Sequence, residues 1–423
     1  MASWQTLALD DCIIESLFPE TDTSAGENVG FFPISEGASR GSVGIQSEVP
    51  LRPDLPANIL LRLEDSSTSL AAVVAMQHAA HSVLPDIVPP CLDLGAVTTC
   101  SGRVVEYSIR ELFINADGVF TLEEVLPRLS AAAKTAMVDQ VVDAMARLQK
   151  EAPDVIATIA KLASARDPSA AAAQPDVSAT CGGPRMGFAT SSRELLGLLF
   201  TPSYRSVPAC TLTDLPCGGV RVTSVHDEED AVDFCPADLD ALQRSTVLCH
   251  GNLEPRNILV QRVGGSDASP QFTLAGIIGW ERAAFVPFAV EYGKKDAGLG
   301  KENSDFAWYS LFKQRSARLL PEEPVTDKLL GALWLYDVAC DADLPFNVRL
   351  CLQERWMQFH GIEQSPEIRV GWARKPEAGE LPVMTPEEWH LMQESVLEEL
   401  GLLDKEVLDE LEKIIFETDL AKM

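Results

Sequence analysis

Apolar and polar positions follow two rhythms in this chain, strand-like near the N-terminus and helix-like toward the C-terminus. Short apolar runs at Asn58–Leu63 and Arg103–Ile109 are typical of buried strands. The segment Phe31–Gln46 has three glycines within Gly37–Gly44, and it predicts a hairpin whose backbone can approach a partner closely. Between the hairpin and the last strand, the Ala-rich segment Ser67–His81 predicts a helix.

Helix signals dominate the remainder. Apolar residues recur on one stripe of Ala131–Gln149, which predicts an amphipathic helix, and Leu7–Leu17 and Ser192–Phe200 show shorter helical patterns. The run Thr385-Pro386-Glu387-Glu388 is a helix start, because a capping hydroxyl precedes a proline and two acids in the first turn. A last apolar stripe in Leu402–Phe416 predicts a helix face that packs on a core.

Three segments carry turn chemistry instead of a regular period. Val83–Leu94 contains three prolines and predicts a loop. Residues 164–187 are rich in Ala, Pro, Asp and Gly and predict a linker or surface excursion. Thr201–Asp238 is also rich in turn residues and contains an acidic patch, Asp227-Glu228-Glu229-Asp230.

Composition indicates a large globular protein. With 423 residues, 46% of them hydrophobic, the chain is long enough for one bilobal unit or two modest domains. No apolar run reaches the length of about 18 residues that a membrane helix needs, and no signal-peptide pattern opens the chain. The ten cysteines show no Cys-x-x-Cys spacing, so we expect free thiols in a reducing compartment and a cytoplasmic protein.

The net charge of −29 excludes some partners. Nucleic acids and anionic membranes select basic surfaces, so neither is expected to bind. A nucleotide stays compatible, because a small phosphate site needs only local donors. The acidic surface suits solubility or a cationic protein partner.

One segment concentrates residues with chemical potential. Two apolar runs flank a polar turn in Val247–Val260, and a further strand ends in Leu274–Glu281, which predicts a strand, a loop and a hairpin. The loop gathers His250, Asn252 and Asn257 at the spacing of a kinase catalytic loop. In that loop an Asp accepts the substrate hydroxyl proton, and an Asn five residues later binds Mg²⁺.

This segment resembles the His-Gly-Asp-x-x-x-x-Asn loop of the aminoglycoside phosphotransferase and choline kinase-like family. It is most similar to the fungal branch, in which the next strand ends Ile-Asp-Trp-Glu. The positions that match are His250, Gly251, Leu253, Pro255, Arg256, Asn257, Ile258, Leu259, Gly276, Ile277, Ile278, Trp280 and Glu281. Weaker similarity extends from about Phe31 to Phe312, with Gly182-Gly183-Pro184 and Gly187-Phe188 resembling a family insertion.

The resemblance implies an α+β, bilobal, protein-kinase-like fold. Residues 1–107 would form a small antiparallel β lobe, and residues 108–423 a larger, mainly helical lobe that contains the catalytic-loop remnant 247–281. It implies a phosphotransferase ancestry, with ATP and Mg²⁺ as ligands and a small hydroxylated molecule as substrate.

The resemblance also assigns candidate site residues. Gly37, Ser39 and Gly41 would lie in the nucleotide loop. Arg62 would be the basic residue of the third strand that binds phosphate. The catalytic positions would be His250 and Asn252, and the metal positions Asn257 and Glu281.

The chain departs from the family pattern where charge matters most. Asn252 replaces the catalytic Asp, and an amide can orient a hydroxyl but has no usable basicity. Gly279 replaces the second metal-binding Asp and offers no side-chain oxygen, whereas Mg²⁺ prefers carboxylates. Val73 occupies the helix position where a Glu should pair with Arg62.

Three hypotheses follow from these departures. The first is a pseudokinase that acts as an accessory or binding protein in small-molecule metabolism. The second is an active phosphotransferase that uses relocated acids, Glu254 and Glu281; alternatively Glu254 is a surface acid and Glu281 pairs with a neighbour such as Arg256. The third is a pocket with other chemistry on a metabolite, in which His250 is an acid–base candidate or a structural histidine.

Overall fold

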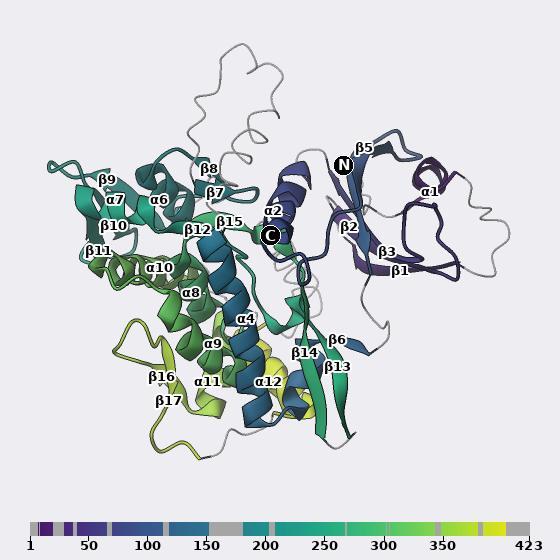
Figure 1. The fold of residues 1–423 in the computed structure, drawn as a ribbon. Coiled ribbons are helices and arrows are strands. Elements are labelled where there is room, and N and C mark those ends of the chain that lie inside the picture. Colours follow the sequence, from purple (N-terminus) through teal and green to yellow (C-terminus); the bar gives the residue numbers. More distant parts are fainter. Residues whose placement is uncertain are drawn as a thin grey trace, which may run out of the picture. The chain divides into compact units, whose positions relative to one another are not determined.

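The computed structural model describes residues 7, 9–19, 29–36, 40–65, 70–112, 118–151, 181–202, 208–266, 269–301, 303, 305–342, 348–379 and 384–402. The chain forms two compact units, which both appear in Figure 1. The first comprises Met1–Ser178, Gly183–Arg185 and Asn252–Ala284, and the second comprises Ala179–Gly182, Met186–Gly251 and Phe285–Met423.

The first unit is built on a five-stranded antiparallel sheet with the strand order β1-β2-β3-β5-β4. Its strands are β1 (Val29–Glu36), β2 (Arg40–Ser47), β3 (Asn58–Asp65), β4 (Asp93–Thr98) and β5 (Val104–Glu111). The hairpin and the two strands that the sequence predicts in this region are therefore confirmed, while Gly37 and Ser39 lie outside the described residues.

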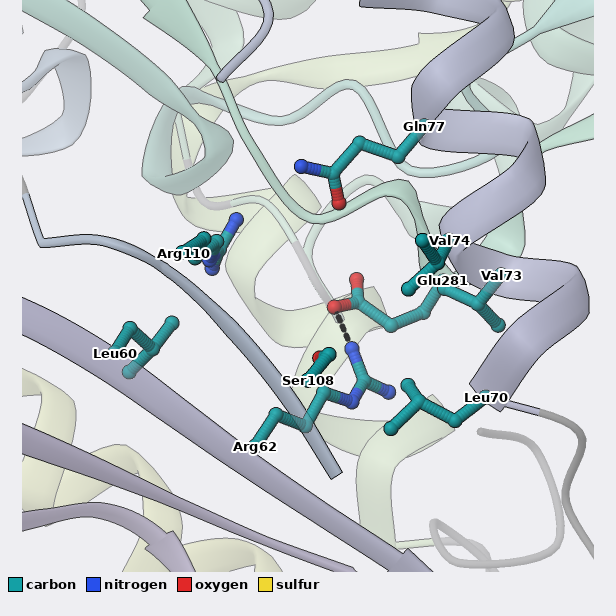
Figure 2. A pocket seen from close by; sticks show the side chains of 9 residues that line it. All are labelled: Leu60, Arg62, Leu70, Val73, Val74, Gln77, Ser108, Arg110 and Glu281. Atoms are coloured by element: carbon teal, nitrogen blue, oxygen red, sulfur yellow. Dashed lines mark hydrogen bonds and ion pairs between the residues drawn. The ribbon is translucent and has the colours of Figure 1, made fainter. Parts of the chain in front are cut away.

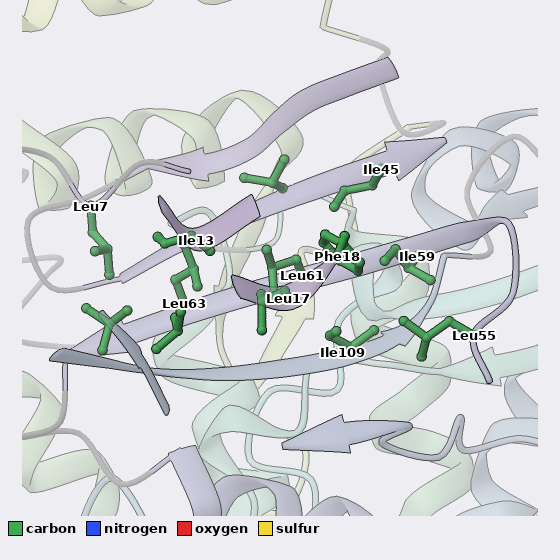
Figure 3. Close-up of a cluster of buried hydrophobic side chains, with 13 residues drawn as sticks. Leu7, Ile13, Leu17, Phe18, Ile45, Leu55, Ile59, Leu61, Leu63 and Ile109 are labelled. Carbon is green, nitrogen blue, oxygen red and sulfur yellow. The ribbon is translucent and has the colours of Figure 1, made fainter. Parts of the chain in front are cut away.

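One face of this sheet carries the hydrophobic core of the first unit. Successive residues of a strand point to opposite faces, and Ile59, Leu61 and Leu63 of β3 are all buried in this core. Helix α1 (Asp11–Leu17) adds Ile13 and Leu17 to the same cluster (Figure 3). Burial of each of these side chains stabilises the folded state by about 1.5–3 kcal/mol, and the buried face therefore holds the sheet in place.

The opposite face is polar, and it carries the candidate site. In β3 the alternate residues are Leu60, Arg62 and Glu64, and Arg62 lies between Ser42 of β2 and Ser108 of β5 in the strand register. Helix α2 (Leu70–Val83) lies beside this face, and its first backbone N–H donates to the Glu106 carboxylate of β5 at 2.6 Å.

The rest of the first unit contains the strands that follow the catalytic-loop remnant. A three-stranded sheet has the order β14-β13-β6, and helix α4 packs against β14. The elements are β6 (Val119–Thr121), α3 (Leu122–Val125), η2 (Leu126–Arg128), α4 (Ala131–Glu151), η5 (Pro255–Asn257), β13 (Ile258–Ser266), β14 (Ser269–Ile277) and η6 (Trp280–Arg282). The predicted amphipathic helix and the predicted strand–loop–hairpin are confirmed.

The second unit contains three small sheets and most of the helices. One sheet has the order β12-β15-β7-β8, a second the order β11-β10-β9, and a third pairs β16 with β17. The strands are β7 (Cys181–Gly183), β8 (Gly187–Ala189), β9 (Cys210–Asp214), β10 (Val220–Ser224), β11 (Ala231–Phe234), β12 (Thr246–Cys249), β15 (Ala284–Pro287), β16 (Ile362–Gln364) and β17 (Trp372–Arg374). The helices are α6 (Ser192–Phe200), α7 (Pro236–Arg244), α8 (Phe288–Gly298), α9 (Phe306–Ser316), η7 (Ala317–Leu319), α10 (Pro324–Ala342), α11 (Val348–His360) and α12 (Pro386–Glu399).

These elements confirm the α+β class, with an antiparallel sheet in the N-terminal part and helices concentrated toward the C-terminus. The helix start at Thr385 is also confirmed, because its side chain and Glu388 form a capping box. The kinase-like arrangement of two lobes, with a boundary at residue 107, stays a prediction. Among the described helices none is both long and apolar enough to span a membrane.

Between Thr201 and Asp238, where the sequence shows only many turn residues, strands β9, β10 and β11 form a sheet. These strands have only four or five residues, too few for their alternation to stand out against the turns between them. In β10, buried Val220 and Val222 flank exposed Arg221. The predicted stripe in Leu402–Phe416 lies outside the described residues except for Leu402, and the predicted linker at 164–187 is described only from residue 181.

The expectation of ten free thiols is wrong for two cysteines. Cys12 of α1 and Cys100, in the turn between β4 and β5, form a disulfide across 88 residues of sequence. Asp10 supports this arrangement, because its carboxylate accepts from the backbone N–H of Ile13 at 3.0 Å and of Cys100 at 2.8 Å. The pairing depends on the packing of α1 against β4, which no local spacing of cysteines reveals.

Candidate functional site

The polar face of the N-terminal sheet centres on Arg62. Its guanidinium forms ion pairs with Glu64, two residues along β3, and with Glu281 of η6. The Nε atom of Arg62 donates to Glu64 Oε1 at 2.8 Å. Burial lowers the pKa of Arg62, but Glu281 and Glu64 more than offset that effect, so the pKa lies above its ordinary value. Arg62 is therefore held as a cation between two acids.

Glu64 is fully buried and has a second cation. Arg185, which follows β7, donates from its terminal nitrogen to Glu64 Oε1 at 2.9 Å. A buried carboxylate needs such charge-assisted partners to offset its desolvation. Arg185 follows Gly182-Gly183-Pro184, which resembles a family insertion, and its side chain reaches Glu64 of β3 within the first unit.

Two further arginines extend the cluster. Arg40 lies directly opposite Glu64 in the β2–β3 register, and Arg110 lies opposite Leu60 in the β3–β5 register. Burial lowers the pKa of Arg40, and the neighbouring cations Arg185 and Arg62 lower it further. Burial also lowers the pKa of Arg110, although Glu281 opposes that change. An arginine stays protonated under such shifts, so both add positive charge to the site.

A small pocket opens among these groups. Figure 2 shows Arg62 and Arg110 from the sheet, Gln77 from α2, and Glu281 lying among them. Apolar side chains of α2 form one wall, and Val73 is among them. The open volume is about 20 Å³, little more than one water molecule occupies. Glu281 thus fills space next to Arg62 that a larger ligand would need.

The loop after Gly251 brings two of the predicted site residues together. The Asn257 side-chain amide donates to the backbone carbonyl of Asn252 at 2.8 Å, and Arg256 donates to Asn252 Oδ1 at 3.2 Å. The Glu254 carbonyl accepts from the Asn257 backbone N–H at 2.8 Å, which closes the turn. Asn252 is consequently a hydrogen-bonded loop residue with no negative charge to offer.

Gly279 has a backbone conformation that excludes most other residues. Its φ is +81°, in the left-handed region that favours glycine. A β-carbon added there would lie 2.6 Å from Asn257 Oδ1 and 2.8 Å from Asn257 Cγ. The Asn257 side chain therefore occupies the place where the side chain of an acid at position 279 would begin.

These groups do not fit a magnesium site. Mg²⁺ requires octahedral oxygen ligands, usually including one or two carboxylates. Positions 252 and 279 supply an amide and a bare backbone, and Glu281 is paired with Arg62. Glu254 is buried, and its Oε2 atom is shielded from solvent. The alternative that Glu254 is a surface acid is therefore wrong. A carboxylate in these surroundings is also poorly placed to bind a hydrated metal ion.

The His-Gly part of the loop belongs to the second unit. His250 is completely buried, and the Gly251 backbone N–H donates to the Glu291 carboxylate of α8 at 2.6 Å. Cys249 is buried as well, and burial raises the pKa of its thiol well above the ordinary value, as expected for an inert cysteine. Within this unit, both His250 and Cys249 are therefore interior residues, and their burial is typical of a structural role.

Sequence reasoning found part of this site. It named Arg62 and Glu281 separately, yet it did not pair them, because 219 residues lie between them. It named Gly41, which the structure places in β2 beside Ser42, the register partner of Arg62. It missed the cluster residues Arg40, Glu64, Arg110 and Arg185. The alternation of charged residues along β3 and β5 could have pointed to Glu64 and Arg110, whereas Arg40 in β2 and Arg185 after β7 had no such signal.

Comparison with known proteins adds little. No protein-family model matches the chain, and no curated protein does. Among solved structures, the AMP-bound complex of spectinomycin phosphotransferase APH(9)-Ia aligns with 75% of this chain and 86% of its own, at 11% identity and a TM-score of 0.28. A superposition this weak says nothing about the function of the present chain.

Proposed function

We propose that this chain is a phosphotransferase-like protein with impaired catalysis, which acts as a binding protein for a small molecule. The observation that carries the proposal is the position of the Asn257 side chain against Gly279. With a glycine at 279 and an amide at 252, neither position that the family resemblance assigns to a carboxylate can hold Mg²⁺ or accept a proton.

The ion pair between Arg62 and Glu281 supports the same proposal. Phosphoryl transfer depends on positioning the phosphates and neutralising their charge, largely through cations and metal ions. Here the candidate phosphate-binding arginine is already matched by two acids. A nucleotide phosphate would have to compete with Glu281 for Arg62, and it would do so without a well-formed metal site.

An active phosphotransferase with relocated acids is the second candidate. Glu281 supports this second candidate only by its position beside Arg62. Its carboxylate is already engaged in the ion pair with Arg62, which leaves it poorly available to bind a metal. Glu254 supports this candidate less, since its Oε2 atom is buried. Non-kinase chemistry on a metabolite has no specific observation behind it, because His250 is buried.

ATP turnover tests the proposal. We expect the wild-type chain, given Mg²⁺-ATP and a panel of hydroxylated amines, to release ADP at least a hundredfold more slowly than the roughly 1–100 per second of ordinary kinases. The variants Glu254→Gln and Glu281→Gln should leave this background unchanged. Turnover at ordinary rates that either variant abolishes would establish the relocated-acid phosphotransferase instead.

Nucleotide binding is measured separately from turnover. A ligand at a hundredfold excess over its dissociation constant stabilises the folded state by about 2.7 kcal/mol, which a thermal-shift assay detects. A stabilising ligand together with absent turnover is the combination that the proposal expects.

A further inference from the structure

The Arg62 pocket is locally basic in a strongly acidic protein. Four arginines, at positions 40, 62, 110 and 185, lie near the carboxylates of Glu64 and Glu281 on this face of the sheet, and Arg62 and Arg185 form ion pairs with them. Glu106 is a third acid on the face, and it is engaged at the first backbone N–H of α2. The cluster keeps an excess of positive charge even with Glu106 included, whereas the whole chain carries −29.

Some of the guanidinium donors in this cluster have no acceptor. Arg110 lines the pocket, and among the described residues its guanidinium has no hydrogen-bond or ion-pair partner. The Nε atom of Arg185 is buried and, again among the described residues, has no hydrogen-bond partner. Unsatisfied donors in partly buried surroundings are costly, and an anion with several oxygens is the kind of ligand that satisfies them.

The size of the pocket adds a condition. At about 20 Å³ it cannot admit a phosphate group while Glu281 lies against Arg62. Carboxylate and phosphate oxygens bind a guanidinium in the same fork geometry, so one can replace the other on Arg62. Glu281 is the more exposed member of the pair, with 26% of its side chain accessible against 13% for Arg62, so it is the group that an incoming anion displaces.

We propose that this pocket binds a phosphate-bearing ligand as the metal-free anion, which replaces the Glu281 carboxylate on Arg62. The inference rests on the proposed function, because it names the ligand class of the same site. The arginines supply the neutralising charge that Mg²⁺ supplies in a kinase. Chelated Mg²⁺ cancels much of the negative charge that the anion presents to the four guanidinium groups, so the metal complex binds here more weakly than the free anion.

Inorganic pyrophosphate is the probe that isolates this chemistry, because it carries phosphate groups and no base or sugar. Titration calorimetry of the full chain is done in EDTA and again with excess Mg²⁺. We expect binding in EDTA, and weaker binding when Mg²⁺ chelates the probe. An active site of the usual kinase type predicts the opposite order.

Three substitutions give the test its direction. Glu281→Gln removes the competing carboxylate and should tighten pyrophosphate binding by about tenfold. Arg110→Gln removes a donor and should weaken it by about tenfold. Asp65→Asn makes the same charge change as Glu281→Gln in the adjacent Asp65–Arg103 ion pair, and it should leave the affinity within about twofold.

Several results would overturn the proposal. They are no binding of pyrophosphate at about 10 mM in EDTA, binding that requires Mg²⁺, or weaker binding by the Glu281→Gln variant. Equal tightening by Asp65→Asn and Glu281→Gln would also contradict it, because the effect would then be that of net charge alone. ATP turnover is the separate readout for the proposed function, so either idea can fail while the other stands.

Discussion

The side-chain oxygen of Asn257 lies 2.6 Å from the point where a β-carbon on Gly279 would stand. This contact links the two elements that the family resemblance assigns to metal binding, η5 and the turn before η6. Because Asn257 is itself tied to the Asn252 carbonyl, it cannot turn away without losing a hydrogen bond. The packing of the loop therefore favours a residue without a β-carbon at position 279.

Substitution of Gly279 tests that contact. Gly279→Ala should lower the free energy of unfolding by about 1–2 kcal/mol for the left-handed backbone, and by about 1–3 kcal/mol more for the collision with Asn257. Gly102→Ala is the matched control, because Gly102 has φ +83° and open space around its β-carbon position. Urea unfolding measures the stability of both variants. An equal loss of unfolding free energy in the two would show that the Asn257 side chain moves aside without cost.

The same contact changes what can be expected of a rescue experiment. Asn252→Asp combined with Gly279→Asp supplies the two carboxylates that the family pattern contains. We expect this double variant to be less stable than the wild type and to gain no ATP turnover, because the carboxylate introduced at position 279 has to displace the Asn257 amide. Turnover that rises at least a hundredfold in coupled assays of ADP release would show that the loop accommodates the acid, and that two side chains alone caused the impairment.

The Cys12–Cys100 disulfide should stabilise the first unit. Closing a loop between residues 88 apart in sequence contributes about 2–4 kcal/mol, mainly by restricting the unfolded chain. The Cys12→Ser variant should therefore unfold at lower urea concentration than the wild type under oxidising conditions, and the two should become alike after reduction. Cys217→Ser, at an exposed free cysteine, is the control that should change nothing. Reaction of all ten cysteines of the unreduced, denatured chain with a thiol reagent would contradict the disulfide.

A buried ion pair in the second unit should be sensitive to the loss of one partner. Lys313 Nζ of α9 lies 2.8 Å from Asp296 Oδ2 of α8, and Asp296 also accepts from the Tyr309 hydroxyl at 2.5 Å. Lys313→Met leaves a buried carboxylate without its cation and should cost about 3–5 kcal/mol. Adding Asp296→Asn to it should recover part of that loss, as measured by urea unfolding. A double variant as unstable as Lys313→Met alone would contradict a charge effect.

The pH dependence of the Lys313→Met variant follows from the same pair. Burial raises the pKa of Asp296, and Lys313 opposes that change, so removing the lysine raises the pKa further. An acid whose folded-state pKa exceeds its unfolded value favours the folded state at low pH and loses that contribution as the pH rises. The free energy of unfolding that the variant loses relative to wild type should therefore become smaller as the pH is lowered from about 8 to about 5. A deficit that stays constant over this range would argue against a buried carboxylate as its cause.

Cys249 should be chemically inert in spite of its place beside His250. Burial raises the pKa of its thiol, so little thiolate forms near neutral pH. Iodoacetamide at mildly alkaline pH should label the exposed Cys217 and Cys235 first, and peptide mapping should find Cys249 unmodified in the folded protein. Rapid labelling of Cys249 would revive its candidacy as a nucleophile.

Local patterns in the sequence were enough to predict many of the elements. The stripe of Ala131–Gln149, the short apolar run of Asn58–Leu63 and the capping residues at Thr385 each depend on neighbours a few positions away. Helix periodicity, strand burial and end-capping act over that short range, so the residues themselves contain the information. The departures from the family pattern at Asn252 and Gly279 could be recognised in the sequence for the same reason, because both positions lie in one short segment.

Only the tertiary structure decided which charges meet. Arg62 and Glu281 are 219 residues apart, and Arg185 reaches Glu64 across 121 residues. The Cys12–Cys100 pair likewise depends on where α1 packs. A long-range ion pair or disulfide leaves no periodic mark on either partner, because it arises from strand register and helix packing, which many distant residues set together.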